Sequence, residues 1–235
     1  MYHRAVLRLF FLCTRKPGLS HAQYAEHLLL RHAPLALRHH ARLRGYVQSI
    51  VVEAHDGAPE LDSINALDYE SLEDFSANAY EGADGERLVT EDHARFLGAA
   101  SGYAARMQLW RDAQPAGAAG APTPGVQWIC ALRRRPALSL ERFAEALESA
   151  FLPDLLASQP GATRVSLGRV ERKLFPDDAP EWDAFCELGF ADAARAPAHP
   201  FDSPDCAMTL RRRVAALCAA AAVWRVREHL LRSAS

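Results

Sequence analysis

The sequence contains one helical segment twice, and this repeat constrains the fold more than any other feature. Residues 15–37 read RKPGLSHAQYAEHLLLRHAPLAL, and residues 134–156 read RRPALSLERFAEALESAFLPDLL. At a constant offset of 119 residues, and without a gap, nine of the 23 positions are identical. In a chain of this length, the repeat predicts two related halves of roughly 110 residues each. The copies differ at His32, which becomes Phe151 in the second copy.

The first half shows the order of signals expected of a β-α-β-β-α-β unit. Runs of strand-forming residues extend from Val6 to Cys13, from Gly45 to Val52, from Ser63 to Tyr69 and from Ala105 to Trp110. Ser20 and Ser71 are predicted helix N-caps, and residues 90–97 form a further helical piece. Pro34 lacks an N–H group, so we expect it to kink or end the first helix. The order is that of a ferredoxin-like fold.

The second half restarts this order after a segment rich in Pro, Gly and Ala. Its predicted elements are a strand at Val126–Leu132, an N-cap at Ser139, a helix at Glu141–Leu156 and strands at Arg164–Glu171 and Trp182–Leu188. The segment before them, DAQPAGAAGAPTP, predicts a linker. We therefore expect an active domain at residues 1–111, a linker at 112–124 and a degenerate repeat at 125–235. Each ferredoxin-like sheet leaves one face bare, and two such faces can bury each other. The predicted fold class is α+β, with two ferredoxin-like units packed sheet to sheet as an intramolecular α/β barrel.

The composition excludes several classes of protein. The chain has 27 basic and 29 acidic residues and a formal net charge of −2, which does not favour a nucleic-acid partner. Its five cysteines lack a CxxC spacing, so we predict neither a disulfide framework nor a zinc site. No signal peptide and no apolar stretch of the roughly 18 residues that a membrane span needs stand out. We expect a cytoplasmic protein without a membrane partner.

Four motifs of the first half follow one another in a characteristic order. They are KPGLSHAQYAEHLLLRHAPLA, GYVQ, LDSINALDYESLEDF and EDHARFLG. In this order they resemble the EthD family of the dimeric α/β-barrel superfamily, over most of residues 6–110. The second half keeps RRPALSLERF, Pro153 and a strand from Trp182, and so looks like a degenerate copy. His27-Leu28 and Ser63 depart from residues that the family often carries, which affects the expected pocket shape.

His32 is the leading candidate for chemistry. A histidine titrates near neutral pH, so it can both accept and return a proton. The helical spacing places it on one stripe with Tyr24 and Leu28, which we expect to face the sheet. The resemblance implies a pocket between sheet and helices, and the histidine of HAPL is the signature polar residue of the family. A structural histidine at a helix end remains the alternative.

Tyrosines and one aspartate are the secondary candidates. A phenol on a strand can orient a carbonyl oxygen with its hydroxyl group, although each of these residues also fits a core role. We predict Tyr24 as a second catalytic residue. The predicted substrate-binding residues are Tyr46, Tyr69, Asp68 and Leu28. We expect Tyr24, His32 and Tyr46 to line a pocket, and their counterparts Phe143, Phe151 and Val165 to fill the same space in the second half.

Histidines are concentrated in the first half, which raises the question of a metal site. His27 and His32 lie five residues apart, which is about 140° around an ideal helix, so their rings should diverge. We therefore predict no metal site and no cofactor. Haem stays open through the resemblance, because several dimeric α/β barrels hold haem through a histidine.

Two functions fit this sequence. The resemblance implies a cofactor-independent lyase, isomerase or cyclase that acts on a small hydrophobic or aromatic carbonyl compound, with His32 as general acid and base. The alternative is a non-catalytic accessory protein that binds a small molecule for a degradation or biosynthesis pathway. Because the two halves already cover each other, the sequence favours a monomer over a homodimer.

Overall fold

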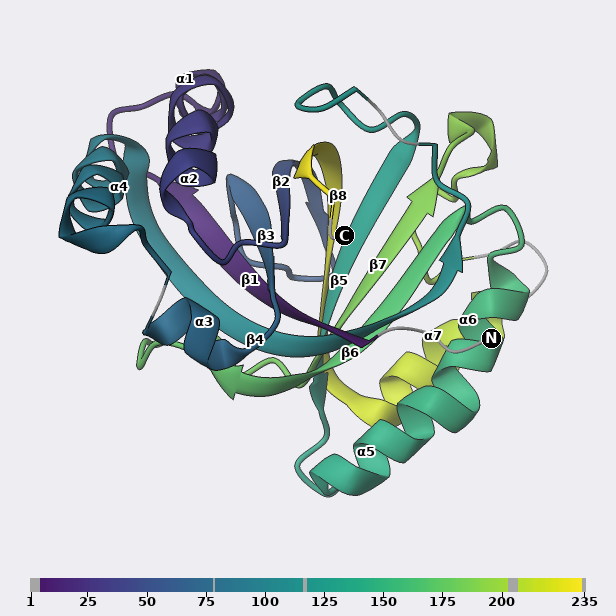
Figure 1. Ribbon diagram of the computed structural model, residues 1–235. Helices are drawn as coiled ribbons and strands as arrows, with labels where there is room; N and C mark the ends of the chain where they lie inside the picture. The colour runs from purple at the N-terminus through teal and green to yellow at the C-terminus, as the bar shows by residue number, and fades with distance from the viewer. Residues whose placement is uncertain (1–4, 78, 116–117, 203–206, 234–235) are drawn as a thin grey trace.

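The strand-forming runs of both halves pair into a single closed sheet. The computed structural model describes residues 5–77, 79–115, 118–202 and 207–233 (Figure 1). The first half contains β1 (Ala5–Arg15), α1 (His21–His27), η1 (Leu28–His32), α2 (Ala33–His39), β2 (Gly45–His55), β3 (Ser63–Tyr69), α3 (Leu72–Ser76), α4 (Gly82–Phe96) and β4 (Leu97–Asp112). The second half contains β5 (Val126–Arg134), α5 (Leu140–Ala146), η2 (Leu147–Phe151), α6 (Leu152–Ser158), β6 (Arg164–Lys173), β7 (Ala184–Phe190), η3 (Ala193–Arg195), α7 (Ala207–Leu217) and β8 (Cys218–Arg232).

The strands form a closed antiparallel barrel in the order β1-β3-β2-β8-β5-β7-β6-β4. Within the first half the neighbours run β4, β1, β3, β2, and within the second half they run β8, β5, β7, β6. The halves join at two seams, where β2 pairs with β8 and β4 pairs with β6. The α+β class and the closed barrel are confirmed. The two sheets bury their inner faces against each other. Their edge strands are also hydrogen-bonded across the seams β2–β8 and β4–β6, so they form one continuous sheet and not two separate stacked layers.

Helices cover the outside of the barrel on two opposite sides. In Figure 1, α1, α2 and α4 lie over the strands of the first half, while α5, α6 and α7 lie over those of the second half. Each side therefore has its own layer of side chains between helix and sheet. In the part of the chain that the structure describes, no helix is long and apolar enough to cross a membrane.

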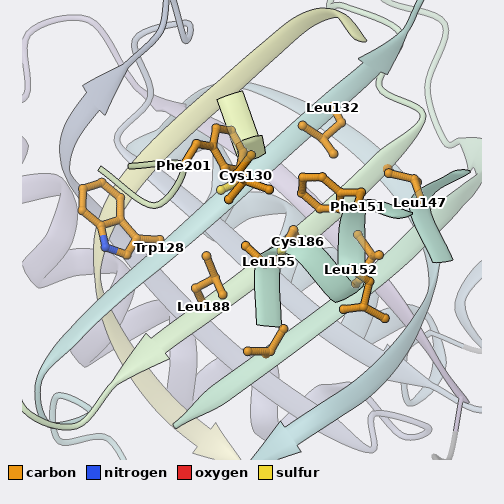
Figure 2. Packing of buried hydrophobic residues seen from close by; sticks show 14 of the residues in the cluster. Trp128, Cys130, Leu132, Leu147, Phe151, Leu152, Leu155, Cys186, Leu188 and Phe201 are labelled. Atoms are coloured by element: carbon orange, nitrogen blue, oxygen red, sulfur yellow. The ribbon is translucent and has the colours of Figure 1, made fainter. Parts of the chain in front are cut away.

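Apolar side chains fill both the barrel and the space under the second-half helices. Inside the barrel, the rings of Phe10 and Phe185 stack with their centroids 4.3 Å apart and join the two halves. Outside it, Phe151 and Leu155 of the helix layer pack over Cys130 and Cys186 of β5 and β7 (Figure 2). Full burial of each large apolar side chain contributes about 1.5–3 kcal/mol to the free energy of folding.

A buried ionic network joins strands of both halves inside the barrel. The guanidinium of Arg8 donates to both carboxylate oxygens of Asp68, at 2.7 and 2.8 Å, and to Glu187 of the second half at 2.7 Å. Gly45 lies opposite Asp68, and a Cβ at that position would come within 2.4 Å of Asp68 Oδ2. Arg164 pairs in the same way with Glu228. The Arg8–Glu187 pair links the halves, whereas Arg164 and Glu228 both belong to the second half. Breaking any of these pairs would leave a buried charge unpaired.

The predicted linker is packed against the barrel. Gly120 N–H donates to the carbonyl of Leu230 at 2.9 Å, and Thr123 N–H donates to the carbonyl of Glu228 at 2.7 Å. The Thr123 hydroxyl also donates to the Glu228 carboxylate. Residues 118–124 therefore run along β8 rather than forming a free tether.

Strand β4 is longer than the sequence predicted, and strand β8 was not predicted. Strand β4 begins at Leu97, directly after α4, whereas the sequence pattern placed its start at Ala105. Strand β8 passes through a run of alanines, a composition that favours helix. In both cases small side chains allow close strand pairing, as in the contact of Ala222 with Ala131 of β5. Tertiary pairing thus overrides local propensity.

Candidate functional site

Helix α1 positions the first candidate residues. Ser20 caps it in a capping box: Ser20 Oγ accepts from Gln23 N–H at 3.2 Å, and Ser20 N–H donates to Gln23 Oε1 at 2.8 Å. The helix does not end at Pro34. It passes through the π-helical turn η1 and restarts as α2, so that proline occupies the first turn, where its missing N–H is tolerated. The second half has the same π turn, η2, before Pro153, so this turn belongs to the shared fold.

A row of polar side chains lies between α1 and the sheet of the first half. We call it the polar row: Cys13, Tyr24, Tyr46, Gln48, Ser63 and Asn65. Every member is at most 8% exposed. The Tyr24 hydroxyl and Ser63 Oγ are 2.7 Å apart. Gln48 Nε2 donates to the Tyr46 hydroxyl at 2.7 Å and to the Leu28 carbonyl at 3.4 Å. Asn65 Nδ2 contacts Cys13 Sγ at 3.6 Å.

The second half has apolar side chains or a thiol at every corresponding position. The strand registers establish the correspondence, because Cys13 pairs with Ser63 as Leu132 pairs with Ala184, and Gln48 pairs with Asn65 as Leu167 pairs with Cys186. The full counterpart set is Leu132, Phe143, Val165, Leu167, Ala184 and Cys186. All six are buried in the cluster of Figure 2 or beside it. The fold therefore does not require polar groups in this layer.

Burial keeps the polar row uncharged. It raises the pKa of the Tyr24 and Tyr46 phenols well above their usual range. It also raises the pKa of the Cys13 thiol to about 12. These groups act at neutral pH as hydrogen-bond donors and acceptors, and the thiol is not an activated nucleophile.

His32 lies in a second cluster, between η1 and α4. Its Nδ1 is 3.0 Å from Asp92 Oδ2, while His27 Nε2 is 2.9 Å from Asp92 Oδ1. Although burial opposes ionisation, hydrogen bonds from both histidines lower the pKa of Asp92 below its usual value. An ionised carboxylate only accepts, so Nδ1 of His32 carries the proton and Nε2 keeps its lone pair. We call His27, His32 and Asp92 the imidazole cluster.

The expectation that His27 and His32 diverge is wrong. An ideal α-helix would separate residues five apart by a large angle, but the turn from Leu28 to His32 is π-helical. A π turn forms i→i+5 hydrogen bonds and therefore brings residues five apart toward one face. Both rings consequently reach the same carboxylate. The sequence contained Asp92 in the motif EDHARFLG but gave no sign of the π turn that completes the cluster.

The environment of His32 holds it neutral. It is 5% exposed, and its ring centroid lies 4.6 Å from that of His93 and 5.0 Å from that of Phe96. Burial, followed by the nearby His93, lowers the pKa of His32 to about 3. His32 therefore faces α4, whereas the helical stripe predicted that it would face the sheet. Phe96 connects the two clusters, because its ring also contacts Tyr24 at a centroid distance of 5.5 Å.

The remaining predicted site residues occupy different places. Leu28 is buried in one cluster with Tyr24 and Phe96. The Tyr69 hydroxyl lies 2.9 Å from His40 Nδ1, at the far end of α2. Asp68 does not join the others, because successive strand residues point to opposite faces and its side chain enters the barrel to bind Arg8. Asp68 therefore lies apart from the other predicted substrate-binding residues.

A surface groove opens beside the polar row. It has a volume of about 440 Å³. Its lining residues are Arg15, His21, Val51, Val52, Glu53, Ala54, Glu60, Leu61, Asp62 and Arg227. Asp62 accepts from Arg15 Nη1 at 2.6 Å and lies 2.8 Å from His21 Nδ1. The next residue, Ser63, belongs to the polar row. Among the residues that the structure describes, no group of three or more His, Cys, Asp or Glu is arranged to hold a metal ion.

A comparison with known families matches the segment of the chain that contains most of both clusters. Residues 16–100 match the family model described as the EthD domain. The match to the EthD family thus covers residues 16–100, and we call the first half of the chain the EthD half. This EthD half contains all of η1 and α4 and most of the polar row, whereas the second half lies outside the match. No curated protein matches the chain.

Solved structures resemble the whole chain in fold. A "putative monooxygenase" of Fusobacterium nucleatum is 11% identical, with a TM-score of 0.62, over 99% of this chain and 94% of that one. An "anthrone oxidase-like protein" is 15% identical, with a TM-score of 0.60, over 98% and 96%. A "putative monooxygenase" of Lactobacillus acidophilus is 11% identical, with a TM-score of 0.56, over 97% and 98%. At these identities the likeness concerns the fold alone.

Proposed function

We propose that the EthD half acts on a small hydrophobic carbonyl compound held at the polar row, by cofactor-independent lyase, isomerase or cyclase chemistry. The observation that supports this most is the contrast between the halves. The same layer is apolar in the second half, so the polar row is not needed for folding. Burying polar groups costs free energy unless they are hydrogen-bonded, and a chain that keeps six of them in one layer has another use for them.

His32 is the proposed general acid and base. Its neutral ring has a free lone pair on Nε2, which can remove a proton from a carbon next to a carbonyl group. The enolate oxygen that forms then needs a donor. The Tyr46 hydroxyl accepts from Gln48 and keeps its own proton to donate, and Tyr24 offers a second hydroxyl. Asp92 stabilises the imidazolium until His32 returns the proton to the product.

A specific observation favours the second candidate function, a non-catalytic binding protein. His32 touches α4 and reaches the polar row through the ring of Phe96. A carrier needs the polar row alone. In that case the imidazole cluster has only the structural role of joining η1 to α4 through Asp92.

We also propose how the chain is organised. Residues 1–111 and 125–235 would be two copies of one ancestral unit, joined by residues 112–124, and the second copy would have lost the site. The matching strand orders β4-β1-β3-β2 and β8-β5-β7-β6 support this. Because the closed barrel pairs the outer strands of both halves, we propose a monomer in the cytoplasm, which light scattering would test.

Proton exchange in D₂O tests the catalytic proposal without knowledge of the product. The protein is incubated with 2-tetralone, an apolar aromatic ketone, and deuterium uptake beside the carbonyl is followed by NMR. We expect uptake about 10²–10⁴ times faster with the wild type than with His32→Ala. Binding without any acceleration of exchange would favour the carrier. Mass spectrometry of small molecules that copurify with the protein would identify better substrates.

A further inference from the structure

We infer that Gln48 and Asn65 form an acceptor site for a hydroxyl group, so that the compound bound by the EthD half is an apolar molecule carrying a hydroxyl group of the phenol or enol type. This inference rests on the proposed function and specifies its substrate class. It concerns residues that the sequence did not single out. Its starting point is a pair of buried oxygens that the protein leaves without donors.

Gln48 Oε1 and Asn65 Oδ1 are buried and have no hydrogen-bond partner among the described residues. Both side chains are more than nine-tenths buried, at 0% and 8% exposure. An amide oxygen without a donor in such a place is destabilising. A molecule that donates hydrogen bonds there would relieve this cost.

The two oxygens belong to neighbouring side chains on one face of the sheet. Gln48 of β2 and Asn65 of β3 are direct cross-strand partners, and directly opposite residues present their side chains on the same side. The nitrogen of Gln48 is fixed by the Tyr46 hydroxyl and the Leu28 carbonyl, which orients its oxygen away from both. The nitrogen of Asn65 has only the Cys13 sulfur, at 3.6 Å.

The surroundings define the rest of the ligand. Leu28, Ile50 and Phe96 are buried in the same cluster as Cys13 and Tyr24, so a ligand here meets mostly apolar surface. Acceptor oxygens within an apolar site select a molecule with an apolar body and a donor group, because an ether or hydrocarbon of the same shape leaves the oxygens unpaired. A cation is not favoured, since no ionised carboxylate belongs to the polar row.

The surface groove lies beside the polar row, where β2 and the segment before β3 meet. Val51 and Val52 of β2 line it, at the position of a β-bulge. Asp62, which also lines the groove, directly precedes Ser63 of the polar row.

The second half provides the matched substitutions. At the positions of Gln48 and Asn65 it has Leu167 and Cys186, both buried and both compatible with the same strand pairing. The double variant Gln48→Leu/Asn65→Cys therefore removes both acceptors and introduces residues that this fold accepts. Ser49→Ala is the control, because Ser49 is buried on the opposite face of β2, next to Gln48.

The experiment compares 1-naphthol with 1-methoxynaphthalene, which has the same rings but no hydroxyl proton. Both are titrated into the full-length wild type, the double variant and Ser49→Ala, and binding is followed by NMR on the side-chain amide signals of Gln48 and Asn65. We expect the wild type and Ser49→Ala to bind 1-naphthol at least about tenfold more tightly than the ether. Both amide signals should shift. The double variant should lose this preference and unfold at no lower temperature.

Three results would overturn the inference. The first is equal affinity of the wild type for both probes, and the second is an unchanged preference in the double variant. The third is that neither probe binds and that the side-chain amides of Gln48 and Asn65 show NMR contacts to water alone. Measuring 1-naphthol binding to His32→Ala separates this inference from the proposed function. If His32→Ala keeps the preference and proton exchange is absent in all forms, the acceptor site stands and the catalytic proposal fails. If exchange depends on His32 but the preference is absent, the reverse holds.

Discussion

The layer between helices and sheet is built in two ways in this molecule. Under α1 and η1 the EthD half buries a polar row and an imidazole cluster, whereas under α5 and η2 the second half buries Phe143, Phe151 and their apolar neighbours (Figure 2). The capping serine, the π turn and the proline are common to both. The second half thus serves as an internal control for what the fold requires.

We attribute the features that the halves share to folding, and the polar row and the imidazole cluster to the proposed function. A buried Phe151 contributes through contact with its neighbours, including Phe201, whose ring centroid is 6.2 Å away. A buried His32 gives up part of that apolar contact and needs Asp92 as a partner. Of the two halves, the EthD half has the costlier arrangement.

The largest expected effect is on catalysis by His32→Ala. We expect deuterium uptake by 2-tetralone to fall by a factor of about 10² to 10⁴, because the group that moves the proton is gone. The free energy of unfolding should fall by only about 1–3 kcal/mol, since Asp92 keeps its bond to His27. Kinetics and urea unfolding of the same preparation measure both. His199→Gln, which changes a buried histidine of the second half, is the control and should exchange deuterium at the wild-type rate.

Asp92→Asn should have a smaller effect through His32. An amide cannot accept from both rings, so the tautomer of one histidine must change. We expect turnover to fall roughly 10- to 1,000-fold, with a smaller change in KM. The ¹⁵N shifts of the His32 ring would report the tautomer. Unchanged ring shifts together with reduced turnover would contradict a positioning role.

The pH dependence of stability should differ between the wild type and His32→Phe, which copies Phe151. Burial and His93 lower the pKa of His32 from 6.5 to about 3. Between these values the unfolded chain binds a proton that the folded chain does not, so this contribution to stability is complete above pH 6.5 and is lost as the pH falls. From pH 7 to pH 5 the wild type should lose on the order of 1–2 kcal/mol more than the variant. Parallel urea midpoints at both pH values would refute this.

Phe151→His should create no activity. The second half has no hydroxyl groups in place of those of Tyr24 and Ser63, since Phe143 and Ala184 occupy those positions. The buried imidazole should lower the free energy of unfolding by roughly 1–3 kcal/mol. Thermal unfolding and deuterium exchange check the two parts. Measurable exchange at this engineered histidine in a His32→Ala background would show that the surrounding residues are dispensable.

Local sequence signals accounted for most of the strands, the capping serine and the burial of Tyr24, because alternation, caps and helical stripes follow from nearby residues. The closed barrel followed from bare sheet faces. The features that local sequence signals missed depend on contacts between residues distant in sequence. Strand β8 is made from an alanine run that pairs with β5, and no local pattern predicts that pairing.

The same distinction holds for the candidate site. Tyr24 and Tyr46 lie in the helix layer, whereas the orientation of His32 toward Asp92 depends on the π turn and on α4. Asp68 lies apart because strand alternation sends it into the barrel, where Arg8 of another strand binds it. Gln48 and Asn65 were missed, since a sequence does not show which polar side chains end up buried without donors.

The most direct test of the account copies the second half into the polar row. Tyr24 and Ser63 bond to each other, and their counterparts Phe143 and Ala184 have no polar group, so Tyr24→Phe/Ser63→Ala removes a complete hydrogen-bonded pair. Replacing both partners of a buried pair is nearly neutral for folding. Unfolding temperature and deuterium exchange are measured together on this double variant. We expect an unfolding temperature within a few degrees of that of the wild type, which corresponds to a loss of about 1 kcal/mol at most in the free energy of unfolding. Deuterium exchange should fall at least about tenfold. A strongly destabilised variant that still exchanges at the wild-type rate would show that the polar row serves the fold and not the function.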